Sequence, residues 1–327
     1  MKSICICNQK GGISKTTSTS SLGFVLDKMG YKVLLIDLDS QASLSQLCQV
    51  YPADFTVEDE PVYGLQDVFE YAVEQEENHQ PYNIEAIKAA IMRPQYREAV
   101  RVKNGDKFTT KFEYKDFGFD LIPADTELAN YEQILSRRKD GGFILLRILR
   151  CIEENMDYDF VLMDAPPALT TLAYSGIAAS TDGLIVPVNL EVLSLRGTKN
   201  IITATAEIQK YLQKAGVKHY GILGLLKNRY VKRYKVQQDF NDIIQEFFPV
   251  PSFETIIPAM TSVDKAHAKG WLFSQYDKKA FEIYKSLAQE IIAKTESQKG
   301  HEPVIIEEIG KGAEAILATG REVDDNE

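Results

Sequence analysis

Short apolar runs alternate with helical patterns along most of this chain. Runs of this kind are typical of strands that are covered on both faces of a parallel sheet. The apolar runs are residues 2–7, 31–37, 119–124, 160–164, 183–188, 220–226 and 253–258. Apolar positions at helical spacing occupy residues 126–155, broken near Gly141-Gly142, and residues 195–215 and 278–297. The alternation predicts an α/β fold with a doubly wound, mostly parallel sheet between two helical layers.

Residues 51–118 do not follow this alternation. They contain two predicted helices, Leu65–Glu74 and Ile84–Met92. Two alternating runs, AVRV and FTTKFEY, follow and are joined through Asn104-Gly105, which indicates a β-hairpin. We therefore expect an α/β domain made of residues 1–50 and 119–298, an α+β insertion at 51–118, and a C-terminal tail at 299–327.

Composition excludes several classes of protein. The 327 residues are 44% hydrophobic and 26% charged, which is ordinary for a globular chain and unlike a disordered one. No apolar run approaches the ~18 residues of a membrane span, and the apolar stretch at the N-terminus is too short for a signal peptide. The four cysteines form no C-x-x-C pair, so neither a zinc site nor a disulfide framework is indicated. A reducing cytoplasm is the expected location.

The net charge of −10 is unevenly distributed. Residues 51–87 hold ten acids and no Lys or Arg, and residues 299–327 hold eight acids and three bases. These two acidic stretches carry −15 between them, which leaves +5 for the rest of the chain. The acidity therefore belongs to the insertion and the tail, and it does not exclude an anionic partner for the main domain.

The segment Lys10-Gly11-Gly12-Ile13-Ser14-Lys15-Thr16-Thr17 lies between the first strand and the first helix, where a phosphate-binding loop belongs. Glycines let backbone N–H groups surround phosphate oxygens, and the helix N-terminus adds partial positive charge. Lys15 would neutralise phosphate charge, and the Thr16 hydroxyl would bind Mg²⁺. The pattern departs from the strict P-loop consensus, because Ser14 replaces its final glycine. Taken alone, the segment is also compatible with a Gly-rich turn before a helix.

Three aspartates follow strands of the predicted sheet. Asp37 and Asp39 end the second strand in IDLDSQ, and Asp164 ends a later strand in VLMDAPP. Carboxylates at the carboxyl ends of parallel strands face the ligand-binding edge of the sheet. Together with a Lys/Thr loop they favour a Mg²⁺-nucleotide site, although Asp37 alone could be a turn residue.

These motifs resemble those of the ParA/MinD-type ATPases. KGGISKTT is similar to the deviant Walker A box of that family, whose usual form is KGGVGKTT. IDLDSQ resembles its switch I, D-x-D-P-Q, and the segment that starts at VLMDAPP resembles its Walker B strand and switch II. LIPADTELANYE and FETIIP are similar to two further family segments. The match covers most of the chain outside residues 51–118 and the tail.

The resemblance implies a P-loop NTPase fold, ATP and Mg²⁺ as cofactors, and a homodimer that sandwiches the nucleotide. Lys10 would reach the partner's phosphates, Lys15 would bind the phosphates of its own site, and Asp39 would position the attacking water. The remaining implied contacts are Gly11, Gly12, Ile13, Ser14, Thr16 and Thr17 in the loop, Thr16, Asp37 and Asp164 around Mg²⁺, and Asn228 and Pro258 at the adenine.

Two residues depart from the family pattern. Ser14 stands where the family has glycine, and Ser40 stands where ParA proteins have proline. If residue 14 needs a positive φ, serine costs on the order of 1 kcal/mol there. Both departures bear on the rate of hydrolysis more than on nucleotide binding.

The resemblance favours the DNA-partition branch of the family. The acidic terminus AEAILATGREVDDNE disfavours binding to anionic lipid. Lys227, Arg229, Lys232, Arg233 and Lys235 form a basic run with interleaved tyrosines, and Lys265 and Lys269 extend it. We expect phosphate-backbone contacts without base specificity. A solvated loop of skewed charge is the alternative.

The implied function is ATP-dependent segregation of plasmid or chromosomal DNA. The ATPase would be cytoplasmic and nucleoid-associated, slow without DNA and a ParB-like centromere-binding partner, and independent of membranes. Two alternatives stay open. One is a weakly or non-hydrolysing ATP switch that regulates a DNA-associated partner in copy control, and the other is a MinD-like membrane-positioning ATPase.

Overall fold

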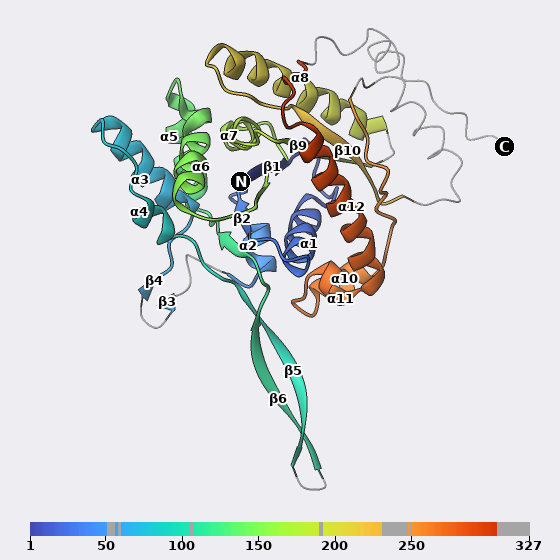
Figure 1. Ribbon diagram of the computed structural model, residues 1–327. Coiled ribbons are helices and arrows are strands. Elements are labelled where there is room, and N and C mark those ends of the chain that lie inside the picture. Colours follow the sequence, from blue (N-terminus) through green and yellow to red (C-terminus); the bar gives the residue numbers. More distant parts are fainter. Residues whose placement is uncertain are drawn as a thin grey trace, which may run out of the picture.

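The computed structural model contains one central sheet of six parallel strands (Figure 1). It describes residues 1–50, 56–57, 60–104, 107–189, 192–230, 248 and 250–305. The sheet strands are β1 (Lys2–Ile6), β2 (Val33–Asp37), β7 (Asp120–Ile122), β8 (Phe160–Asp164), β9 (Gly183–Asn189) and β10 (Ile222–Asn228). Their spatial order is β10-β9-β1-β8-β2-β7, and every pairing is parallel. The predicted fold class is confirmed.

Helices cover both faces of this sheet (Figure 1). The helices are α1 (Lys15–Lys28), α2 (Ser43–Leu47), α3 (Leu65–Glu77), α4 (Ile84–Lys88), α5 (Leu128–Arg137), α6 (Ile144–Asn155), α7 (Thr171–Ala179), α8 (Val192–Lys214), α10 (Ser262–His267), α11 (Phe273–Tyr276) and α12 (Lys278–Ser297), with a short 3₁₀ turn η1 (Gly141–Phe143). Successive residues of β1 divide between two cores. Ile4 and Ile6 pack towards α1, α11 and α12, whereas Cys5 and Cys7 pack towards α6, α7 and α8. This division follows from the period of two along a strand.

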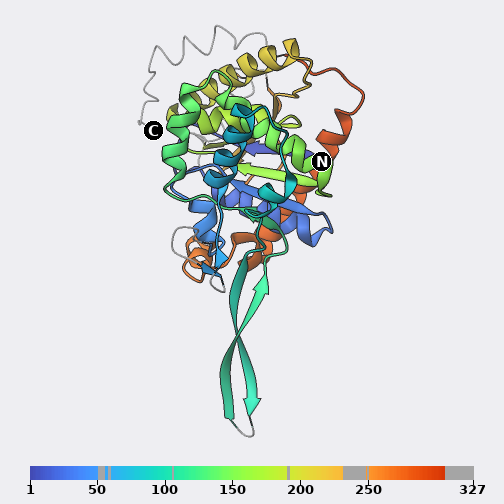
Figure 2. The ribbon, with the colours of Figure 1, turned by 90° about the vertical axis from the view of Figure 1, so that its left-hand side faces the viewer.

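The predicted insertion has two unlike halves. Helices α3 and α4 pack against α6, and Leu65 and Phe69 of α3 are buried in the same core as the sheet. Strands β5 (Gln95–Asn104) and β6 (Lys107–Asp116) instead form an antiparallel hairpin that projects away from the body (Figure 2). The predicted hairpin is therefore confirmed. A small pair, β3 (Thr56–Val57) and β4 (Glu60–Pro61), precedes α3.

Two predicted elements differ from the structure. The helix expected over Ile84–Met92 ends at Lys88, because Met92 instead exchanges two backbone hydrogen bonds with Leu121 of β7. The strand expected over residues 253–258 is wrong. That segment runs beside β10 and makes only isolated bridges, such as Tyr230 with Pro258. Within the described residues no helix is long and apolar enough to cross a membrane.

Candidate functional site

The Gly-rich loop leads from β1 directly into α1, at the carboxyl edge of the sheet. Gly12 has φ +71° and Ser14 has φ 65° and ψ 31°, so both lie in the left-handed region. Ser14 is the residue that immediately precedes the helix, and its side chain makes no capping hydrogen bond. Serine therefore occupies a conformation that favours glycine, which costs on the order of 1 kcal/mol. A Cβ added at Gly11 or Gly12 would meet no atom within 4 Å, so the outer side of the loop is open.

Lys15 and Thr16, the first residues of α1, turn towards the loop and the sheet. Lys15 is only 8% exposed, and its Nζ donates a hydrogen bond to the Lys10 carbonyl oxygen at 3.2 Å. The Thr16 hydroxyl donates to a carboxylate oxygen of Asp164 at 2.6 Å. One turn later, Thr19 donates to the other oxygen of that carboxylate at 3.3 Å. The start of α1 thus places an ammonium group and two hydroxyls around the predicted metal-binding edge.

Asp37 and Asp164 are register partners at the ends of the neighbouring strands β2 and β8. Both are buried. Burial, opposed by hydrogen bonds from Ser45, raises the pKa of Asp37 to about 6. Burial and then repulsion by Asp37 raise the pKa of Asp164 to about 7. Burial and mutual repulsion make the charged form of this pair unfavourable, and a cation bound beside it would offset that cost.

The donor set fits Mg²⁺. The described residues contain no group of three or more His, Cys, Asp or Glu side chains that could hold a metal by themselves. Mg²⁺ is commonly bound by one or two carboxylates together with water and substrate phosphates. Thr16, Asp37 and Asp164 supply hard oxygen atoms of this kind beside the loop. They would hold the ion only together with a phosphate-bearing ligand.

Asp39 lies in a tight turn outside this buried pair. Its backbone N–H donates to Asp37 at 3.2 Å, and its own carboxylate accepts from the Gln41 N–H at 3.0 Å. Asp39 and Ser40 are both half-buried. Asp39 thus lies beside the buried carboxylates and is itself partly exposed.

The predicted adenine contacts lie on the far side of the loop. The Asn228 side chain, at the end of β10, donates to the Ile13 carbonyl at 3.0 Å and is buried. Pro258 pairs with Tyr230 just beyond it. The segment that carries Pro258 is thereby held beside the loop although it forms no strand.

The predicted basic run does not form one surface in the described part of the chain. Lys227 is buried, and burial lowers its pKa. Arg229 is exposed, and its guanidinium lies 3.5 Å from the Gly12 carbonyl oxygen. Lys265 and Lys269 are exposed in and after α10. Lys232, Arg233 and Lys235 lie outside the described residues.

Sequence reasoning missed two residues that position the aspartates. Ser45 in α2 donates through both its N–H and its hydroxyl to Asp37, at 2.9 and 2.8 Å. Thr19 donates to Asp164 from within α1. The run of hydroxyl residues from Thr16 to Ser21 was a usable signal, because Thr16 and Thr19 lie on the same side of a helix. Ser45 carried no comparable signal.

The chain is similar to known proteins in sequence and in structure. The family model of an AAA domain matches residues 1–216. The sporulation initiation inhibitor protein Soj of Bacillus subtilis is 27% identical over 294 residues, 89% of this chain and 98% of that protein. The chromosome-partitioning ATPase Soj of Treponema pallidum is 28% identical over 295 residues, 90% of this chain and 98% of that protein.

Among solved structures, cobyrinic acid a,c-diamide synthase from Mycobacterium smegmatis, with bound ATP analog and magnesium, superimposes with a TM-score of 0.65. It is 24% identical, and the alignment covers 93% of this chain and 99% of that one. This likeness shows the fold.

We predict that position 14 tolerates glycine but not a β-branched residue. Ser14→Gly removes the strain of a left-handed serine and should keep or strengthen nucleotide binding. Ser14→Val is far more strained at φ 65° and should weaken it at least about tenfold. Binding of a fluorescent ATP analogue checks this, with thermal unfolding as the control for folding. Equal affinity of both variants would show that the loop does not keep this conformation when nucleotide binds.

We also predict a pH-dependent stability that Asp164→Asn changes. Unfolded carboxyls titrate near pH 4, whereas folded Asp164 holds its proton up to about pH 7. The folded state therefore binds more protons, and its stability falls as pH rises through this range. Without Mg²⁺, the free energy of unfolding of Asp164→Asn relative to wild type should rise between pH 4 and pH 7 and then stay constant. The rise should be about 1.4 kcal/mol for each unit by which the folded and unfolded pKa values of Asp164 differ.

Thermal unfolding at pH 5 and pH 8 measures this difference. Asp157→Asn is the matched control, because Asp157 is exposed and its pKa is lowered by Lys32. The stability of Asp157→Asn relative to wild type should not increase as pH rises. A pH-independent difference between wild type and Asp164→Asn would contradict the raised pKa.

Proposed function

Because this chain belongs to the ParA/MinD-type family of P-loop ATPases, we propose that it is an ATP-dependent DNA-segregation ATPase that acts in plasmid or chromosome partition. The observation that supports this most strongly is the loop before α1, with Lys15 folded against it and Thr16 bonded to Asp164. Partition is the role named for two of its relatives, the Soj protein of Treponema pallidum and ParA of Caulobacter vibrioides.

ATP and Mg²⁺ are the proposed ligands. The structurally similar diamide synthase holds an ATP analog and magnesium. In this chain the loop N–H groups and Lys15 would bind the phosphates, and Asn228 and Pro258 would border the adenine. Mg²⁺ held by Thr16, Asp37 and Asp164 would neutralise charge on the phosphates.

The proposed reaction is attack of water on the γ-phosphate, which forms one O–P bond and breaks the bond to the β-phosphate oxygen. Asp39, half-buried beside Asp37, would orient the water. Lys10 of the partner in an ATP-bound dimer would stabilise the transferring phosphoryl group. The products are ADP and phosphate.

The ATP-bound dimer is proposed to bind DNA without sequence preference and to release it after hydrolysis. A ParB-like protein would stimulate hydrolysis, and the dimer would associate with the nucleoid. Arg229, Lys265 and Lys269 are exposed cations that suit this role.

A second candidate is a slow or non-hydrolysing ATP switch that regulates a DNA-associated partner. The left-handed Ser14 favours it, because a strained loop can hold ATP in a geometry that hydrolyses poorly. Single-turnover hydrolysis with DNA present separates the two candidates. Turnover within minutes supports the partition cycle, and its absence supports the switch.

We predict opposite effects for two substitutions in the site. Lys15→Ala should abolish ATP binding, because it removes the buried ammonium group from the loop. Asp39→Ala should bind ATP but slow hydrolysis at least about a hundredfold, and so accumulate the dimer. Phosphate release and light scattering measure these effects, with Asp157→Ala as the exposed control. Undiminished turnover in Asp39→Ala would remove its assigned role.

DNA binding by the wild-type chain tests the function itself. Duplex DNA of random sequence should bind only with ATP, and the affinity should fall steeply across a salt series. Binding that is absent with ATP at low salt would refute the proposed function.

A further inference from the structure

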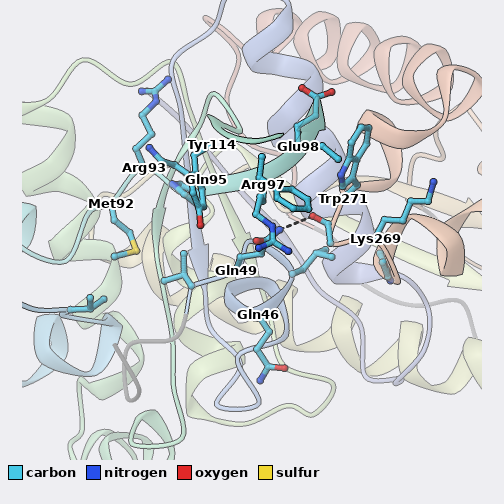
Figure 3. A pocket seen from close by; sticks show the side chains of 18 of the residues that line it. Gln46, Gln49, Met92, Arg93, Gln95, Arg97, Glu98, Tyr114, Lys269 and Trp271 are labelled. Atoms are coloured by element: carbon cyan, nitrogen blue, oxygen red, sulfur yellow. Dashed lines mark hydrogen bonds between the residues drawn. The ribbon is translucent and has the colours of Figure 1, made fainter. Parts of the chain in front are cut away.

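A large cavity lies away from the candidate nucleotide site, at the base of the β5–β6 hairpin. It has a volume of about 1290 Å³ and separates the hairpin from the body of the protein. Figure 3 shows Arg97 and Tyr114 of the hairpin on one side and Trp271 and Lys269 of the body on the other. Gln49, which follows α2, donates to the Gly270 carbonyl at 2.8 Å across the floor. Cations, aromatic rings and amides thus line this cavity together with apolar side chains.

The hairpin has two chemically distinct faces. Directly paired residues of an antiparallel ladder project to the same side. The register pairs Arg97 with Tyr114, Ala99 with Phe112, and Arg101 with Thr110. We call this side, which also carries Gln95, Lys103 and Asp116, the arginine face. Tyr96, Glu98, Val100 and Val102 lie on the opposite side, where Glu98 is ion-paired with Lys115.

The arginine face carries a net positive charge, whereas on the opposite side Lys111 and Lys115 stand beside Glu98 and Glu113. Arg97, Arg101 and Lys103 are all exposed and lie on one strand. Among the described residues of this face the one acid is Asp116, which lies at the base and faces Arg93 at 3.7 Å. Neighbouring side chains on one face of a strand are about 7 Å apart. Successive phosphates of one DNA strand advance about 3.4 Å along the helix axis, so two steps of the phosphate backbone cover about the same distance.

Exposed aromatic rings accompany these cations. Phe112 is 56% exposed and Tyr114 is 71% exposed. The Arg97 guanidinium lies 4.2 Å from the centre of the Phe112 ring, which holds the cation in place on the face. Rings of this size left in water on a projecting ribbon indicate a surface that binds something else.

We propose that the β5–β6 hairpin is a DNA-binding arm whose arginine face lies along the phosphates of a duplex. A two-stranded ribbon fits the major groove of B-DNA, and ten residues per strand span about 33 Å, close to one helical turn. Lys269 lies across the cavity from Arg97 and continues the contact onto the body. The proposal rests on the proposed DNA-binding function and assigns that function to residues outside the ATPase motifs.

The test compares two triple variants of the full chain with ATP and Mg²⁺. Arg97→Gln, Arg101→Gln and Lys103→Gln together remove the cations of the arginine face. Arg137→Gln, Lys139→Gln and Arg150→Gln together remove three exposed cations from α5, the turn after it and α6, and serve as the matched control. Fluorescence anisotropy of a 30-base-pair duplex is measured across a salt series, and thermal unfolding confirms that both variants fold.

The arm variant should bind DNA at least about tenfold more weakly at moderate salt. Its slope of log affinity against log salt should be smaller by about 2 to 3, because each lost phosphate contact lowers the slope by about 0.9. The control should stay within about twofold of wild type. Trp271 is the chain's single tryptophan and lines the cavity, so duplex DNA should change its emission in wild type and not in the arm variant.

Three outcomes overturn the proposal and can be distinguished. Wild-type affinity and slope in the arm variant would leave DNA binding intact and place it elsewhere. A wild-type chain that binds no DNA would refute the proposed function as well. The third outcome is binding that depends on the arm but is tighter for oligo-dT or for an acidic peptide than for duplex DNA. It would assign the arginine face to a different partner.

Discussion

Two carboxylates buried side by side govern the architecture of the candidate site. Asp37 and Asp164 end adjacent parallel strands, so the register of the sheet places them next to each other in the interior. Burying two like charges is costly unless donors or a cation compensate. The hydroxyls of Thr16, Thr19 and Ser45 supply the donors. The hydroxyl-rich start of α1 and the position of α2 follow from this constraint.

The fold could be predicted largely from the sequence because apolar runs and motifs indicate the same arrangement. Strand β8 and helix α12 have the bounds that their apolar patterns indicate. The 253–258 segment could not be predicted, since its apolar residues pack beside β10 through isolated bridges without a continuous ladder. Lys227 also lay beyond sequence reasoning, because its charge indicates a surface whereas its place in β10 buries it.

The candidate site could be predicted residue by residue where motifs exist and not where tertiary contacts decide. The aspartates and the loop follow their strands in sequence, so the sheet topology brings them together. Ser45 reaches Asp37 only because α2 folds back onto β2, and no local pattern reports that contact. Likewise, the charge of residues 51–118 averages over an acidic half and a hairpin on which Arg97, Arg101 and Lys103 share one face. The summed charge of a segment does not reveal that charged residues alternate between the two faces of a strand.

Residues 45–49 contact both the buried acids and the cavity beside the hairpin. Ser45 of α2 donates to the buried Asp37, and Gln49, just beyond the end of α2 at φ 61°, donates to the Gly270 carbonyl on the body side of the cavity. Four positions along the chain separate these two contacts. One short segment thus belongs both to the surroundings of the buried acids and to the wall of the cavity.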